Sequence, residues 1–169
     1  MFECDLSIIK GNYSVGKSTF IFDFARMLKN HLNYKICFIG VSKEIEFEKN
    51  TFKDTFDLIR FYDKEIKTTE LISEILIRDK YDFIFIDDID YILYEKYNKW
   101  LDRILKIPIS KIATFSVFPP FAGDKIEING FKFETYHIGS KFPNTTINGI
   151  NSNKVIEQFI RNKKLERIF

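Results

Sequence analysis

Short apolar runs alternate along the chain with segments of helical periodicity. The runs are rich in β-branched and aromatic residues and nearly continuous, as expected of strands buried on both faces of a parallel sheet. They cover residues 5–10, 35–41, 56–62, 83–87 and 111–118. Helical patterns lie between them, at residues 17–32, 43–52, 69–79 and 94–106. Strands that alternate with helices predict an α/β fold, with a mainly parallel central sheet flanked by helices.

The last third of the chain has a different pattern. Two strand-like segments flank Asn129-Gly130, a pair that favours a tight hairpin turn, and a polar stretch and a helical pattern follow. In order, these segments cover residues 125–128, 131–138, 139–153 and 155–165. We therefore expect a single domain over residues 1–169, with a core over about 1–118 and an appended β-hairpin and helix over about 125–169.

Composition and charge fit a globular domain. Hydrophobic residues make up 45% of the 169 positions, which is enough to bury one core. The formal net charge is +2 and charges of both signs are interleaved, so no long-range field attracts nucleic acid or an anionic membrane. Any basic patch must therefore come from the fold.

The two cysteines and the apolar runs bear on the cellular compartment. Cys4 and Cys37 lie in strand-like runs without C-x-x-C spacing, so we expect reduced core residues and no metal site. No apolar run approaches the ~20 residues that span a bilayer, and the N-terminus has no signal-peptide pattern. The sequence predicts a soluble, cytoplasmic protein with no membrane partner.

One segment matches the phosphate-binding motif G-x-x-x-x-G-K-[ST] at every fixed position. It reads Gly11-Asn12-Tyr13-Ser14-Val15-Gly16-Lys17-Ser18 and is followed by Thr19. The segment follows a predicted strand and opens a predicted helix, which is the context that the motif requires. Backbone N–H groups and the positive end of a helix can wrap a phosphate chain where glycine gives clearance. We therefore predict a site for a nucleoside triphosphate, with ATP as the expected ligand.

Three side chains of this phosphate loop have expected roles toward the nucleotide. Lys17 would contact the β- and γ-phosphates, and the Ser18 hydroxyl would coordinate Mg²⁺. Thr19 would lie toward the α-phosphate. The expected cofactors are thus ATP and Mg²⁺.

An acidic pair follows the apolar strand at residues 83–86. Asp87 and Asp88 come at its C-terminal end, where ligands of open α/β sheets bind, and the segment has the form of a Walker B element. Asp87 would hold Mg²⁺ through its water shell. Asp88 would accept a proton from the attacking water or hold that water in line.

With these elements in place, residues 6–118 resemble the RecA-like ATPase core, nearest in style to replicative hexameric helicases and KaiC-type ATPases. Two predicted strands separate the phosphate loop from the acidic pair, which favours such ATPases over nucleotide kinases and GTPases. The resemblance makes Glu44, after the second strand, a second candidate for the catalytic base. It also puts Thr114 or Ser116 at the position of a γ-phosphate sensor and implies oligomers with nucleotide at subunit interfaces.

A second resemblance is to AAA+ initiator and helicase-loader ATPases. Their Walker B element often reads Ile-Asp-Asp followed by an apolar residue, as residues 86–89 do here. The C-terminal helical lid of that family is reduced in this chain to one helix.

Three functions remain open at this level. The first is an ATPase coupled to single-stranded or double-stranded DNA or to a replication or packaging protein. The second is a nucleotide or nucleoside kinase, and the third is a nucleotide-binding interaction module without turnover. DNA binding rests on basic residues of the last helix, for which a solvated helix face is the competing interpretation. These residues are Lys154, Arg161, Lys163, Lys164 and Arg167.

Overall fold

The computed structural model describes most of the sheet and two long helices. The described residues are 1–2, 6–12, 14–40, 54–61, 79–89, 103–116, 133–141 and 144–169. The strands are β1 (Leu6–Gly11), β2 (Ile36–Gly40), β3 (Leu58–Phe61), β4 (Phe83–Ile86), β5 (Ser110–Ser116), β6 (Phe133–Lys141), β7 (Asn144–Ile147) and β8 (Ile150–Asn151). The helices are α1 (Lys17–Leu32) and α6 (Ser152–Glu166).

All eight described strands belong to one sheet, in the order β3-β2-β4-β5-β1-β6-β7-β8. The six strands from β3 to β6 run parallel, and β7 and β8 extend the edge in antiparallel pairing. Strand β5 therefore lies between β1 and β4, which precede the phosphate loop and the acidic pair. Because all three strands are parallel, their carboxyl ends meet at the same edge of the sheet.

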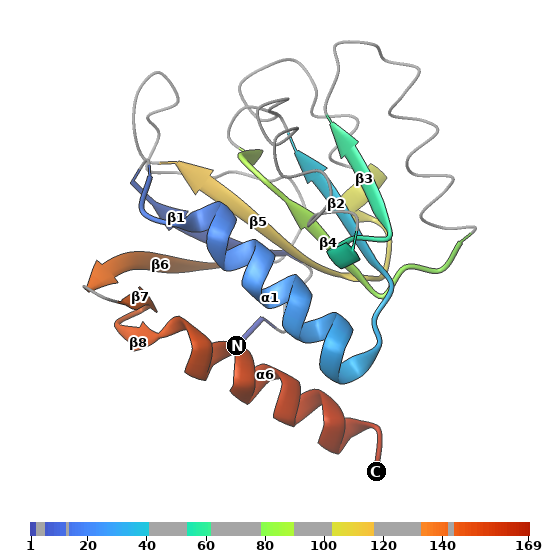
Figure 1. Ribbon diagram of the computed structural model, residues 1–169. Helices are drawn as coiled ribbons and strands as arrows, with labels where there is room; N and C mark the ends of the chain where they lie inside the picture. Colours follow the sequence, from blue (N-terminus) through green and yellow to red (C-terminus); the bar gives the residue numbers. More distant parts are fainter. Residues whose placement is uncertain are drawn as a thin grey trace.

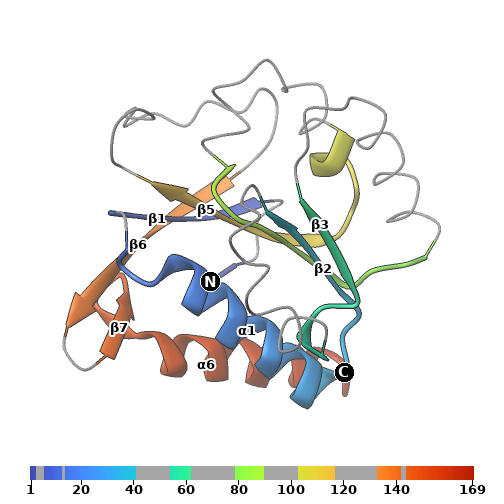
Figure 2. The ribbon, with the colours of Figure 1, turned by 45° about the horizontal axis from the view of Figure 1, so that its top comes forward.

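One face of the sheet is covered by α1 and α6, which run side by side in both views (Figures 1 and 2). Phe24 of α1 is at the centre of this layer, with its ring centroid 5.2 Å from that of Phe159 of α6 and 5.8 Å from that of Phe83 of β4. A second apolar cluster on the opposite face includes Ile8 and Ile84. Burial on both faces explains why β1, β2 and β4 are continuous apolar runs.

The predicted α/β class and mainly parallel sheet are confirmed. The helix predicted at residues 17–32 is α1, the last helical pattern is α6, and the five predicted core strands are β1 to β5. Residues 43–52, 69–78 and 94–102, where helices were predicted, lie outside the described residues.

The predicted C-terminal helix is confirmed, and a C-terminal hairpin is present that differs from the one predicted around Asn129-Gly130. The predicted turn at Asn129-Gly130 lies outside the described residues, and the described hairpin joins β6 to β7. Strand β6 also pairs in parallel with β1, so it belongs to the main sheet and is more than an appendage. Residues 139–153, which the sequence pattern describes as a polar stretch without assigned strands, contain β7 and β8.

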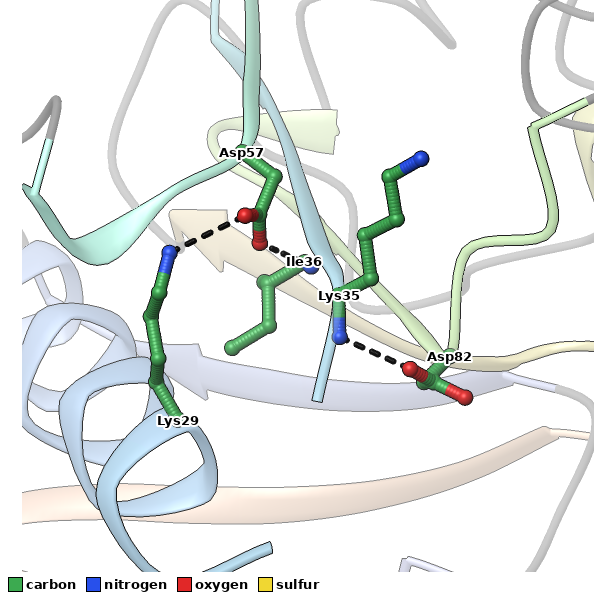
Figure 3. Close-up of polar contacts among 5 residues, drawn as sticks. All are labelled: Lys29, Lys35, Ile36, Asp57 and Asp82. Atoms are coloured by element: carbon green, nitrogen blue, oxygen red, sulfur yellow. Dashed lines mark hydrogen bonds and ion pairs between the residues drawn. The ribbon is translucent and has the colours of Figure 1, made fainter. Parts of the chain in front are cut away.

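Two carboxylates secure the start of β2, at the end of the sheet away from the phosphate loop (Figure 3). Asp57 accepts a hydrogen bond from the backbone N–H of Ile36 at 2.8 Å. It also forms an ion pair with the ammonium of Lys29 of α1 at 3.0 Å. Asp82 accepts from the backbone N–H of Lys35 at 2.7 Å. Side chains that precede β3 and β4 thus satisfy donors at the edge of the neighbouring strand.

We expect Asp57→Ala to lower the free energy of unfolding by about 1–3 kcal/mol, because it leaves the Ile36 N–H without this acceptor. Lys29→Ala is the matched control, since it removes only a half-exposed ion pair, worth about 0–1 kcal/mol. Urea unfolding of both variants measures the difference. Equal losses would mean that the ion pair, and not the N–H bond, is the stabilising contact.

Candidate nucleotide-binding site

The phosphate loop connects β1 to α1 through backbone conformations that glycine and short polar residues tolerate. Gly16 has φ +96° and Ser14 has φ +59°, both in the left-handed region. Left-handed residues within a turn point successive N–H groups to one side and form an anion-binding concavity. Tyr13 lies outside the described residues.

Gly11 has a packing role that its motif alone does not suggest. A Cβ atom added there would lie 2.4 Å from Cγ2 of Ile138 on β6 and 3.0 Å from the Ile138 carbonyl oxygen. Strand β6 therefore approaches the start of the loop so closely that no side chain fits. On the other side of the loop, Thr145 of β7 lies against Gly16, with its hydroxyl 3.5 Å from an added Cβ. The β6–β7 hairpin thus supports both ends of the loop.

The N-terminus of α1 has no side-chain cap, unlike that of α6. Gly16 caps α1 without a side-chain hydrogen bond, and the first turn has no acidic residue. In α6 the Asn151 side chain accepts from the N–H groups of Asn153 and Lys154. The first N–H groups of a helix need external acceptors, and together with the dipole they favour an anion.

Lys17 is held inside the loop. Its ammonium donates to the carbonyl oxygens of Gly11 at 3.0 Å and Asn12 at 2.6 Å, and the side chain is buried, with 6% exposure. These bonds place the charge at the start of α1, within the ring of the loop. A phosphate group that enters the loop would compete with these two carbonyls for the same ammonium.

Ser18 and Asp87 come together as the sequence predicted. The Ser18 hydroxyl donates to Oδ2 of Asp87 at 2.9 Å, which joins the start of α1 to the end of β4. Oδ1 of Asp87 accepts from the hydroxyl of Thr114 on β5 at 2.5 Å. Asp87 is buried, with 4% exposure, and its backbone N–H still donates to the Ile39 carbonyl of β2. Both carboxylate oxygens thus have a hydroxyl partner.

Asp88 leaves the strand and faces a cavity. Its φ is +51°, and its N–H donates to the Thr114 hydroxyl at 2.8 Å. The cavity has a volume of about 310 Å³ and lies between the loop, the start of α1 and the ends of β4 and β5. Its lining includes Ser14, Gly16, Lys17, Ser18, Thr19, Asp88 and Ser116.

Most of the predicted site residues are therefore gathered at one place. Asp87 lies beside the cavity through its bond to Ser18, while Asn12 is an exposed loop residue and Val15 packs against the core. Glu44, the second candidate base, lies outside the described residues. Of the two β5 residues considered as sensors, Ser116 lines the cavity and Thr114 is fully buried beneath it.

The donor set next to the cavity suits a hard cation. Ser18 and Asp87 offer a hydroxyl and a carboxylate, and oxygen is the ligand that Mg²⁺ prefers. Within the described part of the chain, no group of three or more His, Cys, Asp or Glu side chains could hold a metal by itself. Mg²⁺ characteristically binds through one or two protein ligands plus substrate phosphates and water, so the residues fit this ion.

Comparisons with known proteins support the fold. No family model matches the sequence, and no curated protein matches it. Among solved structures, the chain is similar to a KaiC-like protein from the hyperthermophilic archaeon Pyrococcus horikoshii. The TM-score is 0.57 at 14% identity, over 86% of this chain and 78% of that protein. This likeness shows the fold alone, a mainly parallel α/β sheet flanked by helices that is consistent with the RecA-like fold.

No helix in the described part of the chain has the length and apolar character that crossing a bilayer requires. Cys37 is a buried core residue, as predicted, and Cys4 lies outside the described residues.

Proposed function

We propose that this chain binds ATP with Mg²⁺ at the phosphate loop and hydrolyses it. One observation carries the proposal: the start of α1, whose N-cap Gly16 makes no side-chain hydrogen bond, lines a cavity of about 310 Å³ together with Lys17, Ser18 and Asp88. A positive helix end with an ammonium suits a phosphate chain, while the acidic residues suit its cation and the attacking water.

The charges of the site agree with this assignment. Lys17 exchanges the carbonyls of Gly11 and Asn12 for the β- and γ-phosphate oxygens, which are stronger acceptors because they are charged. Ser18 and Asp87 are the residues that hold the cation. Bound Mg²⁺ neutralises part of the charge on the β- and γ-phosphates, as it does in phosphoryl transfer generally.

Hydrolysis requires a group that orients or deprotonates water beside the γ-phosphate. Asp88 lines the cavity together with Lys17 and Ser18, so it lies where such a group is required. Ser116 lines the same cavity from β5 and is the better placed of the two sensor candidates to contact a terminal phosphate.

The proposal is tested by measuring ATP binding and phosphate release by the chain with and without Mg²⁺. We expect Mg²⁺-dependent binding and slow turnover. Single-stranded and double-stranded DNA are then added in separate assays, because the resemblance to helicases makes DNA a candidate activator. Absence of ATP binding would contradict the proposal, and stimulation by either DNA would extend it to a nucleic-acid motor.

A nucleotide-binding module without turnover is the second candidate. Of the described residues that line the cavity, only Asp88 has a carboxylate, and its side chain is short. If ATP binds tightly and no phosphate is released, this candidate replaces the ATPase. Its function would then be to dock on a partner protein in a nucleotide-dependent way.

Partners are part of the same proposal. Lys154, Arg161 and Lys164 are exposed on α6, whereas Lys163 is paired with Glu166 at 2.7 Å. Exposed lysine and arginine on one helix suit DNA phosphates or an acidic surface of a replication or packaging protein. Oligomerisation, which the resemblance implies, is measured by sedimentation with and without Mg·ATP.

A further inference from the structure

The hydroxyl of Thr114 is the common partner of both acidic residues at the end of β4. It donates to Oδ1 of Asp87 at 2.5 Å and accepts from the backbone N–H of Asp88 at 2.8 Å. We propose that Thr114 is a positioning residue that fixes the cation-binding carboxylate and the turn at Asp88, without itself contacting nucleotide. This inference rests on the proposed Mg·ATP site.

Thr114 is held in place from both sides of its own strand. On one side of β5, Thr114 is paired with Ile9 of β1. On the other side, the preceding residue Ala113 is paired with Ile86 of β4. Its side chain has no exposed surface. A buried hydroxyl between two well-paired strands has a fixed position, so it can define the position of its hydrogen-bond partners.

The contact with Asp87 separates two functions of that carboxylate. Oδ2 accepts from Ser18, the residue that the proposed function assigns to the cation, whereas Oδ1 accepts from Thr114. Because Thr114 is fully buried, its bond does not depend on a ligand in the cavity. Thr114 therefore fixes the rotamer of Asp87 so that Oδ2 stays directed toward Ser18. A partner that orients a metal ligand in this way raises metal affinity, and its loss typically costs about 10–100-fold.

The contact with Asp88 stabilises a strained turn. A φ of +51° is unfavourable for a residue with a side chain, although aspartate tolerates it better than most. The paired register of β4 with β5 ends at Ile86 and Ala113, and beyond it the Asp88 N–H donates to the Thr114 hydroxyl. The turn carries Asp88 to the cavity lining. One hydroxyl thus satisfies the N–H of the turn and orients the carboxylate before it.

Only a side chain that both donates and accepts can make these two bonds. Threonine and serine have such a hydroxyl, while valine has nearly the same shape as threonine and neither function. Thr114→Val therefore removes both bonds with little change of volume, and Thr114→Ser retains them. Thr135→Val is the matched control, because Thr135 is an exposed strand residue on β6.

The experiment measures the Mg²⁺ concentration that gives half-maximal thermal stabilisation at saturating ATP, for the full chain and each variant. ATP binding is also measured in EDTA. We expect Thr114→Val to need about 10-fold or more Mg²⁺ while its binding of ATP in EDTA stays as in the wild type. Thr114→Ser and Thr135→Val are expected to behave like the wild type.

The outcomes separate this inference from the proposed function. If the wild type shows Mg²⁺-dependent stabilisation and Thr114→Val shows the same dependence, only the positioning role is wrong. If Thr114→Val loses ATP binding equally with Mg²⁺ and in EDTA, its role is structural and the inference is also overturned. If the wild type is not stabilised by ATP under either condition, the proposed function fails and the inference fails with it.

Discussion

Lys17→Met is expected to lower the affinity for ATP about 100-fold, equivalent to ~3 kcal/mol. The ammonium is the group that neutralises the terminal phosphates, and its side chain is buried at the start of α1. Methionine is one heavy atom shorter but keeps an unbranched apolar stem, so the substitution removes mainly the charge and its hydrogen bonds. Isothermal titration with Mg·ATP measures the loss.

Lys17→Met also deprives the carbonyls of Gly11 and Asn12 of their donor, so the fold of the variant must be verified. Thermal unfolding without nucleotide reports this effect separately. Lys106→Met provides the control, because Lys106 is an exposed lysine before β5 and outside the cavity lining. Unchanged ATP affinity in a folded Lys17→Met variant would contradict the assignment of the phosphate loop.

The parts of the fold that the sequence predicts well are those with a strong local signal. Helix α1 has apolar residues at helical spacing and begins at the residue after a left-handed glycine, so its bounds were predicted correctly. Strands β1, β2 and β4 are short, continuous apolar runs, which few other structures accommodate. Burial on both faces makes such runs recognisable without knowledge of their neighbours.

Strands β7 and β8 lack such a signal. Their residues are mainly Asn, Thr and Ile around Asn148-Gly149, a composition that equally fits a loop. Strand β7 forms because β6 offers an edge with which it can pair, and β8 pairs in turn with β7. Strand formation depends strongly on such context. For the same reason, the local pattern of β6 indicates a strand but does not specify β1 as its parallel neighbour.

Some residues of the candidate site can likewise be predicted from local sequence, whereas others depend on how the strands are arranged. The spacing of Lys17 and Ser18 within one motif fixes their positions, and the strand before Asp87 predicts that it reaches the same edge of the sheet. The bridge through Thr114 requires that β5 lie beside β4 with Ala113 opposite Ile86, and no local pattern contains this register. By sequence resemblance, Thr114 and Ser116 are therefore equal sensor candidates, and only their side-chain environments distinguish them.

Two residues, Asp88 and Glu44, are candidates for the catalytic base, and substitution of Asp88 tests this choice. Asp88→Asn is expected to lower the turnover number for ATP at least about 100-fold while ATP affinity changes little. Asparagine has the same shape and tolerates the left-handed conformation at φ +51°, so the turn and its bond to Thr114 are retained. The variant therefore removes the carboxylate charge beside the cavity and leaves the backbone unchanged.

Steady-state phosphate release and ATP binding are measured on the same preparations, with Asp54→Asn as an exposed control of the same chemistry. A loss of turnover with retained binding assigns the base to Asp88, because a purely structural defect would reduce both quantities. If Asp88→Asn retains full turnover, Asp88 is not the base, and Glu44→Gln is the next variant to measure. Loss of both quantities in a variant that thermal unfolding shows to be as stable as the wild type would instead mean that Asp88 helps to hold the cation with Asp87, since two adjacent carboxylates at one strand end can share that role.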